Sequence, residues 1–300
     1  MPSFHAHVMN FIFRYMPQDK PGQPHDYAAE RKRNDRQPPK PPRGVTVEIG
    51  QLGGMNAEYI RKPGNRDLIF YIHGGGFCVG SAKERRDICQ LIAARYGYNC
   101  VSFDYRLAPE NPWPAQLEDC VKAYRAILEQ GYVPEEIVLM GESAGGTLVL
   151  SLPLKLKELG LPQPKAIISF SPCVTHAEHF PSHTANIKTD YMLRDGVAKG
   201  MGEPVFGKNA TDMKFLRDPC VSPLYGDYSG LPPVFLSASD TEALLDDAVM
   251  LHRKLHEVGH PTQLDIQHGL PHAFQVFSFM PECRKTMGKV FAFLENWDRM

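Results

Sequence analysis

The stretch Gly141-Glu142-Ser143-Ala144-Gly145-Gly146 is the most informative part of this chain. It lies between an apolar, β-prone run at 137–140 and a second apolar run at 147–150. A strand, a glycine-flanked serine and a helix in this order are typical of a nucleophile elbow, in which side chains at the flanking glycines would collide with neighbouring backbone. Such a turn raises the Ser143 hydroxyl above the sheet. Because the short pattern also arises by chance, the rest of the chain must decide its meaning.

From about residue 45, apolar β-prone runs alternate with helix-prone stretches. Strands are expected at 45–49, 56–60, 68–72, 100–103, 137–140, 166–170, 234–238 and 264–266. Helices are expected at 85–96, at 114–130, after Ser143, at 243–258 and at 284–297. Buried strands that alternate with helices predict an α/β fold whose parallel sheet is covered on both faces.

Two segments depart from this alternation. Residues 175–230 are rich in His, Asp, Pro and Gly, with helical fragments at best, and are too long for an ordinary loop. We interpret them as an insertion that covers the carboxyl ends of the strands, where α/β sheets bind ligands. Residues 1–44 combine a short amphipathic helix near 4–15 with a proline-rich stretch at 38–42. Composition alone indicates that they form a solvated arm.

A serine hydroxyl becomes a nucleophile when a histidine takes its proton and a carboxylate orients that histidine. In this fold the acid and then the histidine follow the serine along the chain. His272 lies in the glycine- and proline-bounded loop 269–274, directly after the last expected strand, so we expect it to be the base.

The orienting acid should follow the strand that ends near residue 238, where the chain offers four carboxylates: Asp240, Glu242, Asp246 and Asp247. The last two fall one turn into the following helix, where they suit its N-terminal dipole. Asp240 could cap that helix. Periodicity does not separate Asp240 from Glu242.

Hydrolysis also needs donors for a developing oxyanion. The segment His73-Gly74-Gly75-Gly76-Phe77 directly follows the strand at 68–72. Consecutive glycines allow backbone N–H groups to face inward without reorganisation. A flexible linker would not be bracketed by an apolar strand and Phe77. We expect the N–H of Ala144 to be the partner donor.

Five motifs now occur in one order, at 73–77, 104–110, 113–115, 141–146 and 269–274. Together they resemble the hormone-sensitive-lipase-like esterases, also called family IV carboxylesterases, of the α/β-hydrolase superfamily. The resemblance runs from about residue 45 to the C-terminus. It implies an α/β-hydrolase fold with a mostly parallel central sheet, helices on both faces and a helical cap. Residues 1–300 would form one domain, with cap elements at about 1–44 and 175–230.

The resemblance also implies site residues. Alignment with the family motif Asp-Pro-Leu-x-Asp puts the orienting acid at Glu242, 30 residues before His272. Gly75 and Gly76 would donate to the oxyanion together with Ala144. The segment 104–110 would brace the active-site loops, with Arg106 paired to a carboxylate. Two positions depart from the family pattern, Glu142 and Cys78, and neither removes a required group.

The expected function is therefore hydrolysis of small, short-acyl-chain esters through Ser143, His272 and Glu242, by way of an acyl-enzyme and without cofactor or metal. An amidase, deacetylase or peptidase could use the same residues. The gibberellin receptors resemble this family but have lost the catalytic histidine, so His272 argues against a binding protein. Because family members form dimers through sheet edges, a homodimer stays open.

The composition of the chain indicates which classes of partner and which compartment to expect. With 33 basic and 34 acidic residues, the formal net charge is -1, and no basic cluster predicts a nucleic-acid partner. Seven scattered cysteines without a Cys-x-x-Cys pair indicate reduced, mostly buried thiols and a cytoplasmic protein. No apolar run approaches the length of a membrane span. His252, His256 and His260 are spaced four apart, but without an acidic or cysteine partner we expect a solvated helix face rather than a metal site.

Overall fold

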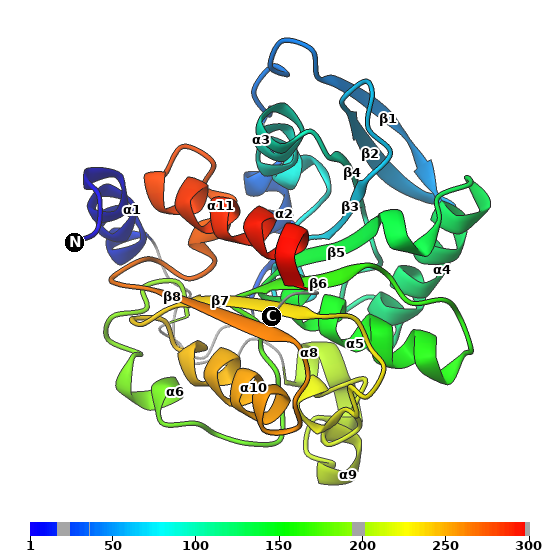
Figure 1. Cartoon of the computed structure of the whole chain (residues 1–300). Helices are drawn as coiled ribbons and strands as arrows, with labels where there is room; N and C mark the ends of the chain where they lie inside the picture. Colours follow the sequence, from blue (N-terminus) through cyan, green and yellow to red (C-terminus); the bar gives the residue numbers. More distant parts are fainter. Residues whose placement is uncertain (17–24, 36, 194–201, 298–300) are drawn as a thin grey trace.

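The computed structural model describes residues 1–16, 25–35, 37–193 and 202–297, and its centre is a mostly parallel sheet (Figure 1). The eight strands lie in the order β1-β2-β4-β3-β5-β6-β7-β8. Their bounds are β1 Thr46–Leu52, β2 Met55–Arg61, β3 Leu68–Ile72, β4 Asn99–Phe103, β5 Ile137–Glu142, β6 Ala166–Phe170, β7 Val234–Ser239 and β8 Thr262–Gln267. β2 pairs antiparallel with β1 and β4, and all other neighbours are parallel. The predicted strands and the parallel sheet are confirmed.

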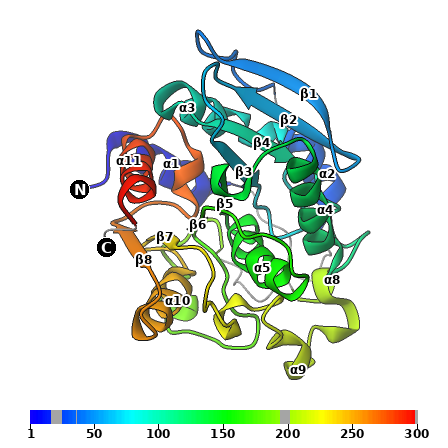
Figure 2. The ribbon, with the colours of Figure 1, turned by 45° about the vertical axis from the view of Figure 1, so that its right-hand side comes forward.

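Helices cover both faces of the sheet, as the run of buried strands predicts (Figure 2). One face carries α4 Ala115–Glu129, α5 Ala144–Glu158 and α10 Leu245–Glu257; the other carries α3 Arg86–Tyr96 and α11 Pro281–Asn296. Successive side chains of one strand point to opposite faces, so Phe70 of β3 joins the first core and its neighbour Tyr71 the second. Both rings are fully buried, which explains why β3 is apolar throughout.

The last helix begins three residues earlier than the apolar periodicity predicts. Pro281 is its first residue. Proline fits the first turn of a helix because its missing N–H would have no partner there and its φ is already helical. The helix therefore begins at this proline and not at residue 284, where the apolar pattern predicts its start.

The N-terminal segment docks on the body of the protein through α1 Phe4–Tyr15 and α2 Tyr27–Asn34. Ser3 donates from its N–H and its hydroxyl to Glu282, at 2.6 and 2.9 Å. The side-chain amide of Asn10 donates to the carbonyl oxygen of Gly269 at 3.0 Å. The solvated arm that composition indicated is therefore wrong for the described residues of this segment.

The insertion forms short helices, α6 Ser182–Ala185, α8 Glu203–Phe206 and α9 Met213–Leu216, as its composition predicts. Parts of the two expected cap segments, residues 17–24, 36 and 194–201, lie outside the described residues, as do 298–300. All seven cysteines are free thiols, and only Cys220 is not buried. Within the described ranges, no helix combines the length and apolarity that crossing a bilayer requires.

Candidate active site

Ser143 sits at the sharp turn between β5 and α5, with φ 56° and ψ -123°. A Cβ on Gly141 would lie 2.6 Å from the carbonyl oxygens of Gly145 and Ile72. A Cβ on Gly145 would lie 2.1 Å from the Ile72 oxygen. Side chains at either position are therefore excluded, as the elbow motif predicts. The strained serine backbone is held by an N–H that donates to Phe170 O at 2.9 Å.

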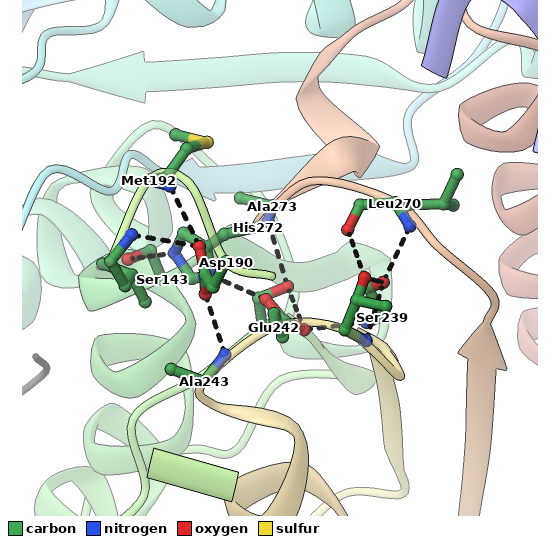
Figure 3. A network of polar contacts seen from close by, with 12 residues as sticks. Ser143, Asp190, Met192, Ser239, Glu242, Ala243, Leu270, His272 and Ala273 are labelled. Carbon is green, nitrogen blue, oxygen red and sulfur yellow. Dashed lines mark hydrogen bonds and ion pairs between the residues drawn. The ribbon is translucent and has the colours of Figure 1, made fainter. Parts of the chain in front are cut away.

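The structure brings Ser143, His272 and Glu242 together in one hydrogen-bonded relay (Figure 3). The Ser143 hydroxyl lies 3.0 Å from His272 Nε2, and His272 Nδ1 lies 2.6 Å from Glu242 Oε2. His272 and Glu242 are both buried. Because a carboxylate can only accept, Nδ1 carries the proton and Nε2 of the neutral ring is left to accept from the serine. The relay can therefore remove the proton from the Ser143 hydroxyl.

Asp240, the other carboxylate that periodicity left open, points elsewhere. Its Oδ2 lies 2.6 Å from His268 Nδ1, and its Oδ1 accepts the N–H of Gly269 at 2.9 Å. It does not cap α10, whose N-cap Leu244 has no side-chain hydrogen bond. The structure thus aligns Glu242, not Asp240, with His272.

Two serines that sequence reasoning missed hold Glu242 in place. Its Oε1 accepts the Ser171 hydroxyl at 3.0 Å and the N–H of Ser239 at 2.8 Å. The Ser171 hydroxyl oxygen also accepts the N–H of Ala273 at 3.2 Å, so it connects the acid to the histidine loop. Ser171 directly follows β6 and has a positive φ of 46°. In the sequence, only its position after a buried strand could have indicated that it has a special role.

The environment of His272 favours its protonated form. Burial alone lowers the pKa of the imidazole, but the hydrogen bond that Nδ1–H donates to Glu242 and the negative charges of Glu242, Asp190 and Glu142 outweigh it, so the pKa lies above the ordinary value of 6.5. The imidazolium that forms when the ring takes a proton is therefore stabilised, as a general base requires.

The glycine-rich segment after β3, residues 73–80, is called the oxyanion loop below. Gly75 has φ 113°, and a Cβ there would lie 2.3 Å from the carbonyl oxygen of Val79, so only glycine fits. Gly76 also has a positive φ, 59°. The N–H groups of Gly75, Gly76 and Ala144 have no hydrogen-bond acceptor among the described residues. Ala144 begins α5, whose positive dipole end points toward Ser143.

Glu142, which departs from the family pattern, anchors the oxyanion loop from inside. Its side chain is 1% exposed and accepts three hydrogen bonds: from Gly74 N and Arg85 Nε, both at 2.6 Å, and from Tyr71 OH at 2.8 Å. Arg85 neutralises this buried carboxylate. A shorter aspartate or a threonine would not span the same three donors, so the departure has a structural use.

Arg31 of α2 holds the same loop from outside. Its guanidinium donates to the carbonyl oxygens of Cys78 and Ala108, each at 2.7 Å, and to both oxygens of Glu110 at 2.9 Å. Nothing in the local sequence of residues 30–33 distinguishes this arginine from its neighbours, because its partners lie 47 to 79 residues away. The second unusual position, Cys78, takes part through its backbone, and burial raises the pKa of its thiol to about 11.

The segment 104–110 braces the loops as the resemblance implies. Arg106 pairs with Asp119 at 2.9 Å and with Glu118 at 3.0 Å. Tyr105 donates to His73 O at 2.8 Å and stacks on the His73 ring with centroids 4.1 Å apart. Burial lowers the pKa of His73 to about 3, so this ring stays neutral and has a structural part only.

The remaining histidines do not converge on one point. His252 lies 3.2 Å from Thr262 Oγ1, and His260 lies 3.0 Å from Pro232 O. In the insertion, His183 pairs with Asp247 at 2.6 Å, while His176 is partly buried, and loss of solvent contact lowers the pKa of its ring to about 4. In the part of the chain that the structure describes, no three His, Cys, Asp or Glu side chains form a group that could hold a metal ion.

Comparisons with known proteins agree with this architecture. A family model described as alpha/beta hydrolase fold matches residues 69–276. An acetyl-hydrolase of Streptomyces hygroscopicus is 32% identical over 255 residues, which cover 83% of this chain and 82% of that protein. An esterase of Acinetobacter venetianus is 31% identical over 262 residues, with coverage of 86% and 85%.

Solved structures are similar over nearly the whole length. The crystal structure of EstE5 soaked with ethyl alcohol has a TM-score of 0.88 at 31% identity, over 99% of both chains. An esterase from the bacterial hormone-sensitive lipase family has a TM-score of 0.81 at 29% identity, again over 99% of both chains.

Proposed function

The chain belongs to the α/β-hydrolase fold family, in its hormone-sensitive-lipase-like branch, and on this premise we propose that it is a serine carboxylesterase. The observation that carries the proposal is the relay in which Ser143 Oγ, His272 and Glu242 are joined at 3.0 and 2.6 Å. A fold alone does not define chemistry, but an activated serine next to donors for an oxyanion does.

In the proposed reaction, Ser143 attacks the ester carbonyl carbon while His272 Nε2 takes the hydroxyl proton. Glu242 keeps the ring in the required tautomer and stabilises the imidazolium. The N–H groups of Gly75, Gly76 and Ala144 donate to the oxyanion of the tetrahedral intermediate. His272 then protonates the leaving alcohol, and water repeats these steps on the acyl-enzyme.

The proposed substrates are small esters with short acyl chains, by analogy with the relative named an acetyl-hydrolase. We further propose that residues 1–44 and 175–230 form the cap of this single domain and bound the pockets for the acyl and alcohol groups. Two contacts support a place beside the site: Asn10 bonds to Gly269 in the histidine loop, and Asn186 of the insertion bonds to Glu242 O.

The test is hydrolysis of p-nitrophenyl acetate by Ser143→Ala. We expect kcat/KM to fall by more than about 1,000-fold, because no other hydroxyl of the described residues is hydrogen-bonded to His272. Ser151→Ala is the matched control: this serine lies on α5, is buried, and its hydroxyl has no hydrogen-bond partner among the described residues. It should keep the turnover of the unaltered protein. Unchanged turnover in Ser143→Ala would contradict the proposed function.

A further inference from the structure

Residues 182–190 of the insertion run along the segment that carries Glu242, residues 239–247, called the acid loop below. At one end, Ser182 donates from its N–H to Asp246 at 2.8 Å and from its hydroxyl to Ala243 O at 2.7 Å. The next residue, His183, pairs with Asp247. These contacts fasten α6 to the start of α10.

The middle of the segment binds the backbone on both sides of the acid. The side-chain amide of Asn186 donates to Asp240 O at 3.1 Å and to Glu242 O at 2.9 Å. The Thr189 hydroxyl lies 2.9 Å from Thr241 O. Three consecutive carbonyl groups of the acid loop therefore face donors from the insertion.

Asp190 ends the segment with a buried carboxylate, 2% exposed. Its Oδ2 accepts the N–H of Ala243, the residue after Glu242, at 2.8 Å (Figure 3). Its Oδ1 accepts the N–H groups of Met192 and Leu193 at 3.1 and 3.0 Å. No lysine or arginine of the described ranges pairs with it. The carboxylate is thus satisfied by hydrogen bonds, and no cationic side chain in the described part of the chain neutralises its charge.

This charge lies close to the relay. Three carboxylates act on His272: Glu242 from the acid loop, Asp190 from the insertion and Glu142 from β5. Glu142 is paired with Arg85, whereas Glu242 and Asp190 have no such partner in the described structure. Their charges oppose the effect of burial, which by itself lowers the pKa of the imidazole.

Resting on the proposed function, we propose that Asp190 is a positioning residue for ester hydrolysis, which fixes the acid loop through Ala243 and places beside the His272–Glu242 pair a second carboxylate that no lysine or arginine of the described residues neutralises. Under this proposal the insertion has two functions. It bounds the substrate pocket, and its residues 182–190 hold the catalytic acid in register.

The experiment measures kcat and KM for p-nitrophenyl acetate between about pH 5 and about pH 9, where the acid limb of kcat/KM reports the free enzyme's base. In Asp190→Asn the limb should move to lower pH, because one charge that favours the imidazolium is removed. The plateau kcat should fall about tenfold, since an amide cannot serve all three N–H donors. KM should stay within about twofold, because Asp190 does not touch the substrate in this scheme.

Two further variants distinguish the effect of the charge of Asp190 on His272 from the effect of its hydrogen bonds on the position of the acid loop. Asn186→Ala removes two hydrogen bonds to the acid loop without changing charge, so kcat should fall while the limb stays in place. Asp246→Asn removes a carboxylate that also binds the segment but is not among the main charges that raise the pKa of His272, so its acid limb should match that of the unaltered enzyme. Urea unfolding shows that each variant is folded under assay conditions.

An Asp190→Asn limb that coincides with that of Asp246→Asn would overturn the inference, even if kcat falls, since loss of stability alone lowers activity without moving the limb. If Asp190→Asn does not fold, the test rests on Asn186→Ala. An unaltered kcat in that variant overturns the inference. Ser143→Ala separates the two proposals. If Ser143→Ala loses turnover while the acid limbs of the other variants do not move, the proposed esterase function stands and only the proposed role of Asp190 is wrong.

Discussion

The oxyanion loop and the acid loop flank the same serine but are held by opposite electrostatic means. Arginines fix the oxyanion loop: Arg85 pairs with the buried Glu142, and Arg31 binds two carbonyl oxygens from outside. Across the described residues, the acid loop is held by hydroxyl, amide, N–H and imidazole groups, and no lysine or arginine pairs with its acids.

The difference follows from the charge that each side meets during the proposed reaction. Negative charge develops at the oxyanion, so an unneutralised Glu142 next to it would oppose catalysis. Positive charge develops on His272, so carboxylates beside it help as long as no cation compensates them. Arg85 thus neutralises the buried carboxylate on the oxyanion side, whereas no lysine or arginine of the described residues pairs with Glu242 or Asp190 beside His272.

The largest effect should come from breaking the neutral pair on the oxyanion side. Arg85→Met leaves Glu142 buried without a cation, which should lower the free energy of unfolding by about 3–5 kcal/mol and reduce kcat. The double variant Arg85→Met/Glu142→Gln should regain part of both losses, because the uncompensated charge is gone. Urea unfolding and p-nitrophenyl acetate turnover measure the two quantities.

The matched control is the pair between Arg86 and Glu58, which joins α3 to β2 away from the site. Arg86→Met should lower stability without a specific loss of kcat in the protein that remains folded. If Arg85→Met and Arg86→Met reduce kcat equally, the electrostatic difference between the two loops does not matter for turnover.

The next effect should come from the oxyanion loop itself. Gly75→Ala places a Cβ 2.3 Å from Val79 O at a φ of 113°, so the loop must shift and its N–H groups must turn. Loss of one oxyanion donor lowers kcat by about 100- to 1,000-fold. Gly64→Ala tests strain alone, since Gly64 also has a positive φ, 92°, but has open space around it. Equal kcat values for the two variants would show that Gly75 has no special part.

The residues that sequence reasoning reached are those whose signal is local. The apolar strand at 68–72, the glycine pattern around Ser143 and the loop of His272 each carry their meaning within a few residues. Glu242 needed the family motif, because a carboxylate after a strand has no period that separates it from Asp240.

The supports of the site could not be read from the sequence, because their partners are distant in the chain. Glu142 was visible only as a departure, and its use depends on Arg85, 57 residues away. Asp190 lies in an insertion without periodicity, and its partner Ala243 is 53 residues away. Such contacts are decided by tertiary packing, which neither propensity nor pattern encodes.

The smallest effect on kcat should come from Arg31, which holds the oxyanion loop from outside. Its size shows how much this arginine contributes to the shape of that loop. Arg31→Lys keeps the positive charge but loses the planar fork that reaches Cys78 O, Ala108 O and Glu110 together. Because this guanidinium is partly exposed and Glu110 more so, kcat should fall only about threefold. Arg66→Lys is the matched control, since Arg66 likewise bridges a carbonyl oxygen, that of Gly131, and a carboxylate, that of Glu136, far from the relay. A loss of kcat in Arg31→Lys as large as in Gly75→Ala would mean that the N-terminal segment, rather than the buried Glu142–Arg85 pair, holds the oxyanion loop in its working shape.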